Sequence, residues 1–204
     1  MTNYTYQNDL PDDLNLGKFV AIDTETMGLK VKSDRLCVLQ ISSGDGDAHL
    51  VQFDNGYDFS APNLRKILED QSVQKIFHFA RFDINMLNFN FNIELKNIFC
   101  TKIASKLVRT YSDHHGLKSL LSEILGVEIS KQQQSSYWGT DKLSKKQINY
   151  AASDVLYLHD LKDNLVNMLK KESKFDLAQE CFKFLEVRSK IDLIGLENID
   201  IFSH

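Results

Sequence analysis

The 204-residue sequence contains very little proline and little cysteine. Its two prolines are Pro11 and Pro62, and no Pro/Gly/Ser-rich stretch divides the chain, so we expect residues 1–204 to form a single domain. Its three cysteines, Cys37, Cys100 and Cys181, are widely spaced and form no C-x-x-C pair. This spacing excludes a disulfide framework and a cysteine zinc site, and it predicts reduced thiols in a cytoplasmic protein.

The chain also lacks an excess of basic residues. It has 24 Lys and Arg against 28 Asp and Glu, a net charge of −4, which argues against a protein that coats long nucleic acid. A small, metal-neutralised nucleotide site remains compatible with this charge. No apolar run approaches the length that crosses a bilayer, and the acidic segment Met1–Asp13 has no signal-peptide pattern. We therefore expect a soluble protein without a membrane partner.

The residues that are present have an ordinary globular composition, with 43% hydrophobic and 25% charged residues. After a polar lead-in, three segments have the pattern of β-strands: Phe19–Ile22, Arg35–Ser42 and His49–Phe53. The Gly-Asp-Gly-Asp turn over residues 44–47 separates the last two. Short polar turns between consecutive strands predict an antiparallel arrangement.

The rest of the chain alternates between helix and strand patterns. Pro62 occupies a position that a first helical turn tolerates, and an apolar helix face follows it. Further expected elements are strands over Lys75–Phe79 and Ile98–Cys100, and helices over Phe82–Asn90, Lys102–Val108, Leu117–Leu125, Leu143–Leu169 with a break near Asn149, and Phe175–Val187. This order predicts an α/β fold: a mixed sheet flanked by helices, with a core over about residues 15–170 and a helical tail over 171–204.

Two acids end the first predicted strand. Asp23 and Glu25 are two residues apart, so on a strand both carboxylates point to the same side. Like charges held this close repel each other and raise the pKa of at least one of them unless something compensates. For this pair alone, a polar strand end at a turn is the simpler interpretation.

Three further residues make a functional interpretation stronger. Asp83 lies between two apolar residues at the start of a predicted helix, where it could also complement the helix dipole. Tyr150 and Asp154 are four residues apart on a later helix, and small residues between them allow close approach to the sheet. If all four acids converge, their natural occupants are hard divalent cations, Mg²⁺ or Mn²⁺. Two such ions are a standard device for hydrolysing a phosphodiester.

These segments resemble the motifs of a known family. Phe-Val-Ala-Ile-Asp23-Thr-Glu25-Thr, His78-Phe-Ala-Arg-Phe-Asp83 and Tyr150-Ala-Ala-Ser-Asp154 are similar to the three motifs of DnaQ-like 3′→5′ exonucleases of the DEDDy branch, to which ribonuclease D belongs. A closer resemblance to the nano-RNase C family rests on Cys100-Thr-Lys-Ile-Ala-Ser-Lys, Ser130-Lys-Gln-Gln-Gln-Ser-Ser and the ending Asp-Ile-Phe. The resemblance implies a ribonuclease H-like fold, a homo-oligomer, and cleavage of short RNA, especially diribonucleotides, to nucleoside 5′-monophosphates.

The resemblance also implies individual roles. Asp23, Glu25 and Asp154 would be direct ligands of two divalent cations, with Asp23 bridging them, and Asp83 would hold its ion partly through water. Tyr150 would orient the attacking water, because a phenol with a pKa near 10 is a weak base at neutral pH. One departure is Tyr137, which stands where ribonuclease D relatives commonly have an acid.

The expected substrate contacts surround these acids. The residues concerned are Thr24, Thr26, Met27, Gly28, Leu29, Gln40, His78, Arg81 and Trp138. Leu29 would wedge between two bases, with an ordinary apolar loop residue as the alternative. The alternative role for Gln40 is a structural hydrogen bond, and the alternative for Trp138 is a packing anchor. His78 and Arg81 would, as their alternative role, support Asp83.

Two alternatives to a dinucleotide-degrading enzyme remain open. One is a broader ribonuclease D-like or DNA-trimming exonuclease, although only about fifty residues follow Asp154 and they form no separate basic domain. The other is an inactive nucleic-acid-binding scaffold on the same fold. The apolar tail residues Ile191–Ile194 and Ile199–Phe202 are expected to dock on a neighbouring protomer.

Overall fold

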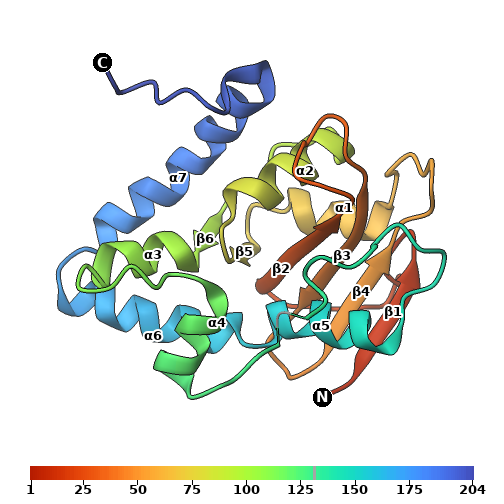
Figure 1. Ribbon diagram of the computed structural model, residues 1–204, viewed down its shortest axis with the longest axis horizontal. Coiled ribbons are helices and arrows are strands. Elements are labelled where there is room, and N and C mark those ends of the chain that lie inside the picture. The colour runs from red at the N-terminus through yellow and green to blue at the C-terminus, as the bar shows by residue number, and fades with distance from the viewer. Residues whose placement is uncertain (131) are drawn as a thin grey trace.

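The computed structural model of the protein, described over residues 1–130 and 132–204, is built on a six-stranded mixed sheet (Figure 1). The strand order is β1-β4-β3-β2-β5-β6. Its strands are β1 (Asn3–Gln7), β2 (Phe19–Thr26), β3 (Leu36–Ser42), β4 (Ala48–Gln52), β5 (Gln74–Phe77) and β6 (Ile98–Cys100). β2, β3 and β4 are antiparallel, whereas β5 and β6 run parallel to β2. The predicted mixed-sheet α/β fold is confirmed.

The central strands follow from their apolar sequences. All seven residues of β3 are buried, as expected for a strand covered on both faces. The turn into β4 contains Gly44 and Gly46, whose φ values of 82° and 93° lie in the left-handed region that glycine adopts without strain. Asp45 supports this turn by accepting a hydrogen bond from the backbone N–H of Asp47 at 2.9 Å.

The first strand, β1, was not predicted, because we interpreted this part of the chain as a polar lead-in. β1 pairs in parallel with β4 at the edge of the sheet, so only part of each side chain is buried. Tyr4 and Tyr6 stack on His49 of β4, with ring centroids 5.0 and 5.8 Å apart. Edge strands of this kind carry little apolar signal, which explains the omission.

The helices are α1 (Pro62–Glu69), α2 (Arg81–Phe91), α3 (Thr101–Val108), α4 (Leu117–Leu120), α5 (Lys145–Leu156), α6 (Leu158–Lys171) and α7 (Phe175–Ile191), with π-helical turns over Leu121–Leu125 and Asp192–Leu196. α5 packs across β2, β3 and β4, while α3, α6 and α7 contact one another beside β6 (Figure 1). Across residues 1–130 and 132–204, the helices are too short or too polar to cross a bilayer.

The predicted helix Leu143–Leu169 was wrong in the position of its break. Asn149 lies inside α5, and the chain turns instead at Tyr157, between α5 and α6. No proline or glycine marks this position. The turn has a packing cause, because α5 lies on the antiparallel strands whereas α6 contacts α3 and β5. At its start, α5 is fixed by a capping box between Ser144 and Gln147.

The end of α7 is tied to α2 of the same chain by Asp192, which is buried. Its carboxylate accepts hydrogen bonds from Arg81 Nε at 2.7 Å and Asn85 Nδ2 at 2.8 Å, and pairs with Arg188 at 2.8 Å. Ile199 and Phe202 beyond it remain 50% and 77% exposed. The structure therefore anchors the start of the tail within the chain, and docking of its end on another protomer stays a prediction.

We expect Asp192→Ala to lower the free energy of unfolding by about 3 kcal/mol, because Arg81 and Arg188 lose a shared, buried acceptor. The matched control is Glu180→Ala, which removes an exposed ion pair with Lys183 and should cost no more than about 1 kcal/mol. Chemical denaturation at pH 7 measures both values. Equal losses in the two variants would contradict the anchoring role of Asp192.

Candidate active site

Pairing of β2 with β3 fixes the first two acids. β2 continues through Thr26, so Asp23 and Glu25 lie within the strand and on one face of it. Asp23 is opposite Gln40 of β3, whose Nε2 donates a 2.6 Å hydrogen bond to Asp23 Oδ2. Gln40 is fully buried and is absent from the lining of the pocket described below. Gln40 therefore holds the Asp23 carboxylate in place from within the sheet.

The third acid comes from α5. Ligand atoms of Asp23, Glu25 and Asp154 all lie within 4.8 Å of one another. α5 approaches the sheet this closely because Ala151 and Ala152, three and two residues before Asp154, are fully buried. The small residues in this segment of the sequence predicted a close approach of the helix to the sheet. The structure has this close approach, and it brings the three carboxylates together.

The fourth acid, Asp83, lies beside this group on the first turn of α2 and is 3% exposed. Thr24 Oγ1 donates a 2.6 Å hydrogen bond to Asp83 Oδ1. Burial raises the pKa of Asp83 to about 7, and the hydrogen bond from Thr24 opposes that rise. Asp83 is thus held by β2 at the margin of the three-carboxylate group.

Burial and charge repulsion together set the electrostatics of the site, with burial the larger of the two. Burial, followed by the charges of Asp83, Asp154 and Glu25, raises the pKa of Asp23 well above its ordinary value. Burial and the charges of Asp154 and Asp83 raise the pKa of Glu25 to about 9. Converging carboxylate oxygens with repulsion of this kind fit a hard divalent cation, which would favour their ionised forms.

Tyr150 faces the acids from α5. Burial raises its pKa first, and the charges of Asp154, Glu25 and Asp23 raise it further, so the phenol stays protonated at neutral pH. Its ring lies 6.1 Å from that of Trp138, centroid to centroid. Trp138 is 2% exposed, which places it as a packing partner of Tyr150 at the pocket wall.

Asp23, Glu25, Asp154 and Tyr150 line a pocket of about 650 Å³, whereas the buried Asp83 lies behind its wall. The predicted substrate residues that also line it are Thr24, Thr26, Met27, Gly28, Leu29, His78 and Trp138. Leu29 projects with 82% of its surface exposed. A Cβ at Gly28 would collide with the carboxylate of Asp34, so a larger residue there would displace this side chain from its 2.8 Å hydrogen bond with the Lys30 N–H.

Of the two predicted contacts near Asp83, Arg81 takes another position and His78 keeps the predicted one. Arg81 points to Asp192 and lines an adjacent cavity of about 670 Å³, rather than the pocket that holds the acids. His78 lines the acid-containing pocket, and its Nδ1 lies 2.9 Å from Thr101 Oγ1. The sequence alternative in which Arg81 supports Asp83 directly does not match this geometry.

The sequence analysis did not select Lys102 and Lys118, which bring positive charge to the pocket. Lys102 Nζ lies 4.1 Å from the ring centroid of Phe79, another unselected lining residue. A signal for Lys102 did exist. It follows strand β6 by two residues and therefore lies at the same edge of the sheet as Asp83, which follows the parallel strand β5.

Comparisons with known proteins agree with this geometry. A family profile described as "3′-5′ exonuclease" matches residues 2–170 of this chain. Ribonuclease D of Acidiphilium cryptum is 33% identical over 171 residues, which cover 84% of this chain and 43% of that protein. The chain thus spans about two fifths of the length of this curated relative.

Similar solved structures cover the whole chain. Brucella melitensis NrnC bound to pGG is 53% identical with a TM-score of 0.96, and covers 100% of this chain and 99% of that one. NrnC of the same organism with bound Mg²⁺ is 52% identical with a TM-score of 0.95, and covers 100% of both chains. On the family match and these similarities, the chain belongs to the 3′-5′ exonuclease family.

Proposed function

We propose that the protein is a divalent-cation-dependent 3′-5′ exoribonuclease that degrades short oligoribonucleotides, especially diribonucleotides, to nucleoside 5′-monophosphates. The observation that carries this proposal is the convergence of Asp23, Glu25 and Asp154 within 4.8 Å, beside Asp83 and Tyr150. Membership of the exonuclease family and similarity to NrnC support it.

Asp23, Glu25 and Asp154 would hold two Mg²⁺ or Mn²⁺ ions, with Asp83 contributing from the margin of the cluster. When bound, such ions supply Lewis acidity for the attacking water and for the leaving oxygen of a phosphodiester. Gln40 holds Asp23 in its orientation, and Thr24 does the same for Asp83. Tyr150 remains protonated, so it orients water or phosphate through its hydroxyl rather than acting as a base.

The preference for short RNA is supported by the form and charge of the pocket. Lys102 and Lys118 line it together with Asp23, Glu25 and Asp154, so they are placed to bind a substrate phosphate that the cations do not hold. Leu29 offers an exposed apolar contact for a base. The pGG bound to Brucella NrnC is a short nucleotide of the size that this proposal requires.

Assembly and location belong to the same proposal. We infer one exonuclease domain over residues 1–204 that forms a homo-oligomer, supported by exposed apolar residues at its end: Ile194, Ile199, Ile201 and Phe202. The thiols of Cys37, Cys100 and Cys181 are free, which fits a reducing cytoplasm.

A broader ribonuclease D-like or DNA-trimming activity is the alternative, supported by the ribonuclease D relative. The presence of all five proposed catalytic residues argues against an inactive scaffold.

Asp23→Asn should lower the rate of dinucleotide hydrolysis by at least about 100-fold, because it removes the carboxylate at the centre of the cation site. Asp141→Asn changes the same side chain on the exposed surface and should leave the rate unchanged. Release of nucleoside monophosphate, measured by chromatography, reports both. An unchanged rate in the Asp23 variant would mean that the assigned site is wrong.

The cation requirement predicts a separate effect on stability. In EDTA at pH 8, Asp23→Asn should melt at a higher temperature than the wild type, because one of the repelling carboxylates is gone. Mg²⁺ should raise the melting temperature of the wild type more than that of the variant. Thermal melting with and without Mg²⁺ measures this crossover. Equal Mg²⁺ effects on the two proteins would place the cation elsewhere.

Substrate length separates the proposed specialist from a general exonuclease. Matched RNA of two, seven and about twenty nucleotides, and DNA of the same sequences, should be digested with the RNA dinucleotide fastest, because a compact pocket encloses few nucleotides. Initial rates at equal concentrations of 3′ ends give the comparison. Similar rates at all lengths would favour the ribonuclease D-like alternative.

A further inference from the structure

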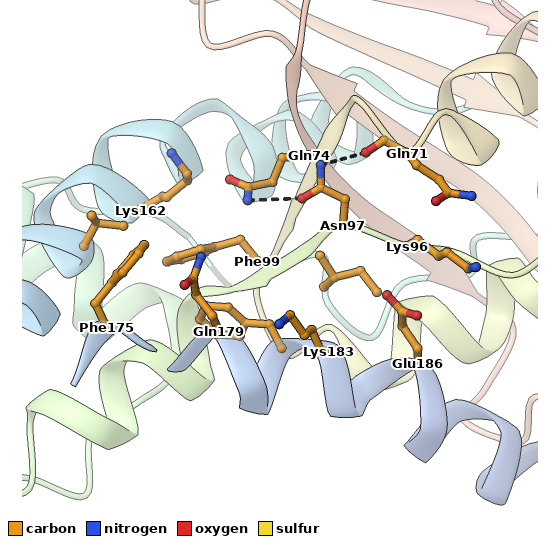
Figure 2. A pocket seen from close by; sticks show the side chains of 13 residues that line it. Gln71, Gln74, Lys96, Asn97, Phe99, Lys162, Phe175, Gln179, Lys183 and Glu186 are labelled. Atoms are coloured by element: carbon orange, nitrogen blue, oxygen red, sulfur yellow. Dashed lines mark hydrogen bonds between the residues drawn. The ribbon is translucent and has the colours of Figure 1, made fainter. Parts of the chain in front are cut away.

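A second cavity, of about 410 Å³, has no described lining residue in common with the candidate active site. It lies where α6 and α7 meet the start of β6 (Figure 2). One face of α7 supplies Phe175, Gln179, Phe182, Lys183 and Glu186. Its volume falls within the roughly 300–1,000 Å³ of small-molecule sites in proteins.

One end of this cavity is aromatic. Phe99 and Phe182 pack with ring centroids 4.6 Å apart and are 2% and 5% exposed, so they form a rigid floor. Phe175 is only partly buried and lies at the same end as Lys162 and Phe99 (Figure 2). An accessible ring beside an apolar floor is suited to stacking on a planar heterocycle.

The other end of the cavity is polar and cationic. Lys96 and Glu186 lie at the end opposite Phe175, and Lys183 lies between them and Gln179 (Figure 2). Among the described lining residues, Lys96 and Lys183 accompany Glu186 in this part, while a third lysine, Lys162, lies at the aromatic end, in a protein whose net charge is −4. The ion pair between Lys183 and Glu180 is about 70% exposed on both sides, so Lys183 can exchange it for another anion at little cost.

Amide groups lie between these two ends. Gln74 Nε2 donates to Asn97 Oδ1 at 3.4 Å, and Asn97 Nδ2 donates to the backbone carbonyl of Gln71 at 3.0 Å (Figure 2). Gln179 borders the cavity from α7 near Phe99. Such side chains can donate to and accept from the edge of a nucleobase.

We infer that this cavity is a second site, which binds a nucleoside 5′-monophosphate: the base contacts Phe175 and the floor, and the phosphate binds Lys96 and Lys183. The choice of a mononucleotide rests on the proposed function, because mononucleotides are its products. The two sites are connected through β6. Phe99 lines this cavity, and Lys102, three residues later, lines the active-site pocket.

Titration calorimetry with GMP tests this inference on full-length Asp23→Asn protein in EDTA, where the acidic cluster cannot hold phosphate through a cation. We expect one GMP per chain, with guanosine and inorganic phosphate each binding at least about tenfold more weakly, because each reaches only one end of the cavity. Absence of GMP binding, or equal binding of GMP and guanosine, overturns the inference.

Charge variants locate the bound GMP. Lys96→Glu combined with Lys183→Glu should weaken binding at least about tenfold, whereas Lys142→Glu with Lys145→Glu, on the exposed surface, should change it less than about twofold. Glu186→Gln should bind GMP about threefold more tightly, a gain that a folding defect cannot produce. Unchanged affinity in the Lys96 and Lys183 variant overturns the inference.

Dinucleotide hydrolysis by the wild type, measured in parallel, keeps the two proposals separate. Hydrolysis without GMP binding at this cavity rejects the second site and leaves the proposed function intact. GMP binding without hydrolysis supports the second site and rejects the proposed function.

Discussion

The burial of mutually repelling carboxylates between β2 and α5 is the constraint on which this structure depends. Asp23, Glu25 and Asp154 are brought within 4.8 Å of one another, in surroundings where burial raises the pKa of both Asp23 and Glu25. An arrangement of this kind costs stability unless positive charge offsets it. Within residues 1–130 and 132–204, the one group of three converging carboxylates lies at the wall of a pocket of about 650 Å³.

The surrounding elements hold the repelling groups in place by ordinary means. β3 supplies a hydrogen bond from Gln40 to Asp23, and β2 itself supplies one from Thr24 to Asp83. α5 carries Asp154 close to the sheet on two buried alanines, and its start is fixed by the capping box at Ser144. Neutral donors and small residues therefore position the acids without neutralising them, which leaves that role to cations.

The sequence predicted the separate parts of this site because their spacing is local, whereas the expectation that the parts meet came from the family resemblance. A two-residue spacing on a strand pairs Asp23 with Glu25, and a four-residue spacing on a helix pairs Tyr150 with Asp154. Long-range contacts were not predictable in the same way. Arg81 was expected near the substrate, but its partner Asp192 is 111 residues away. The turn at Tyr157 and the edge strand β1 also follow from packing between distant segments, with no proline, glycine or long apolar run to mark them.

The most direct measurement of the central claim is a crystal structure with Mn²⁺ and a non-hydrolysable dinucleotide, using anomalous scattering to locate the ions. The account predicts two manganese peaks roughly 3.5–4 Å apart, bound by Asp23, Glu25 and Asp154 and in contact with the phosphodiester. Manganese bound elsewhere on the surface, with the three carboxylates free of cations and the dinucleotide outside their pocket, would contradict it.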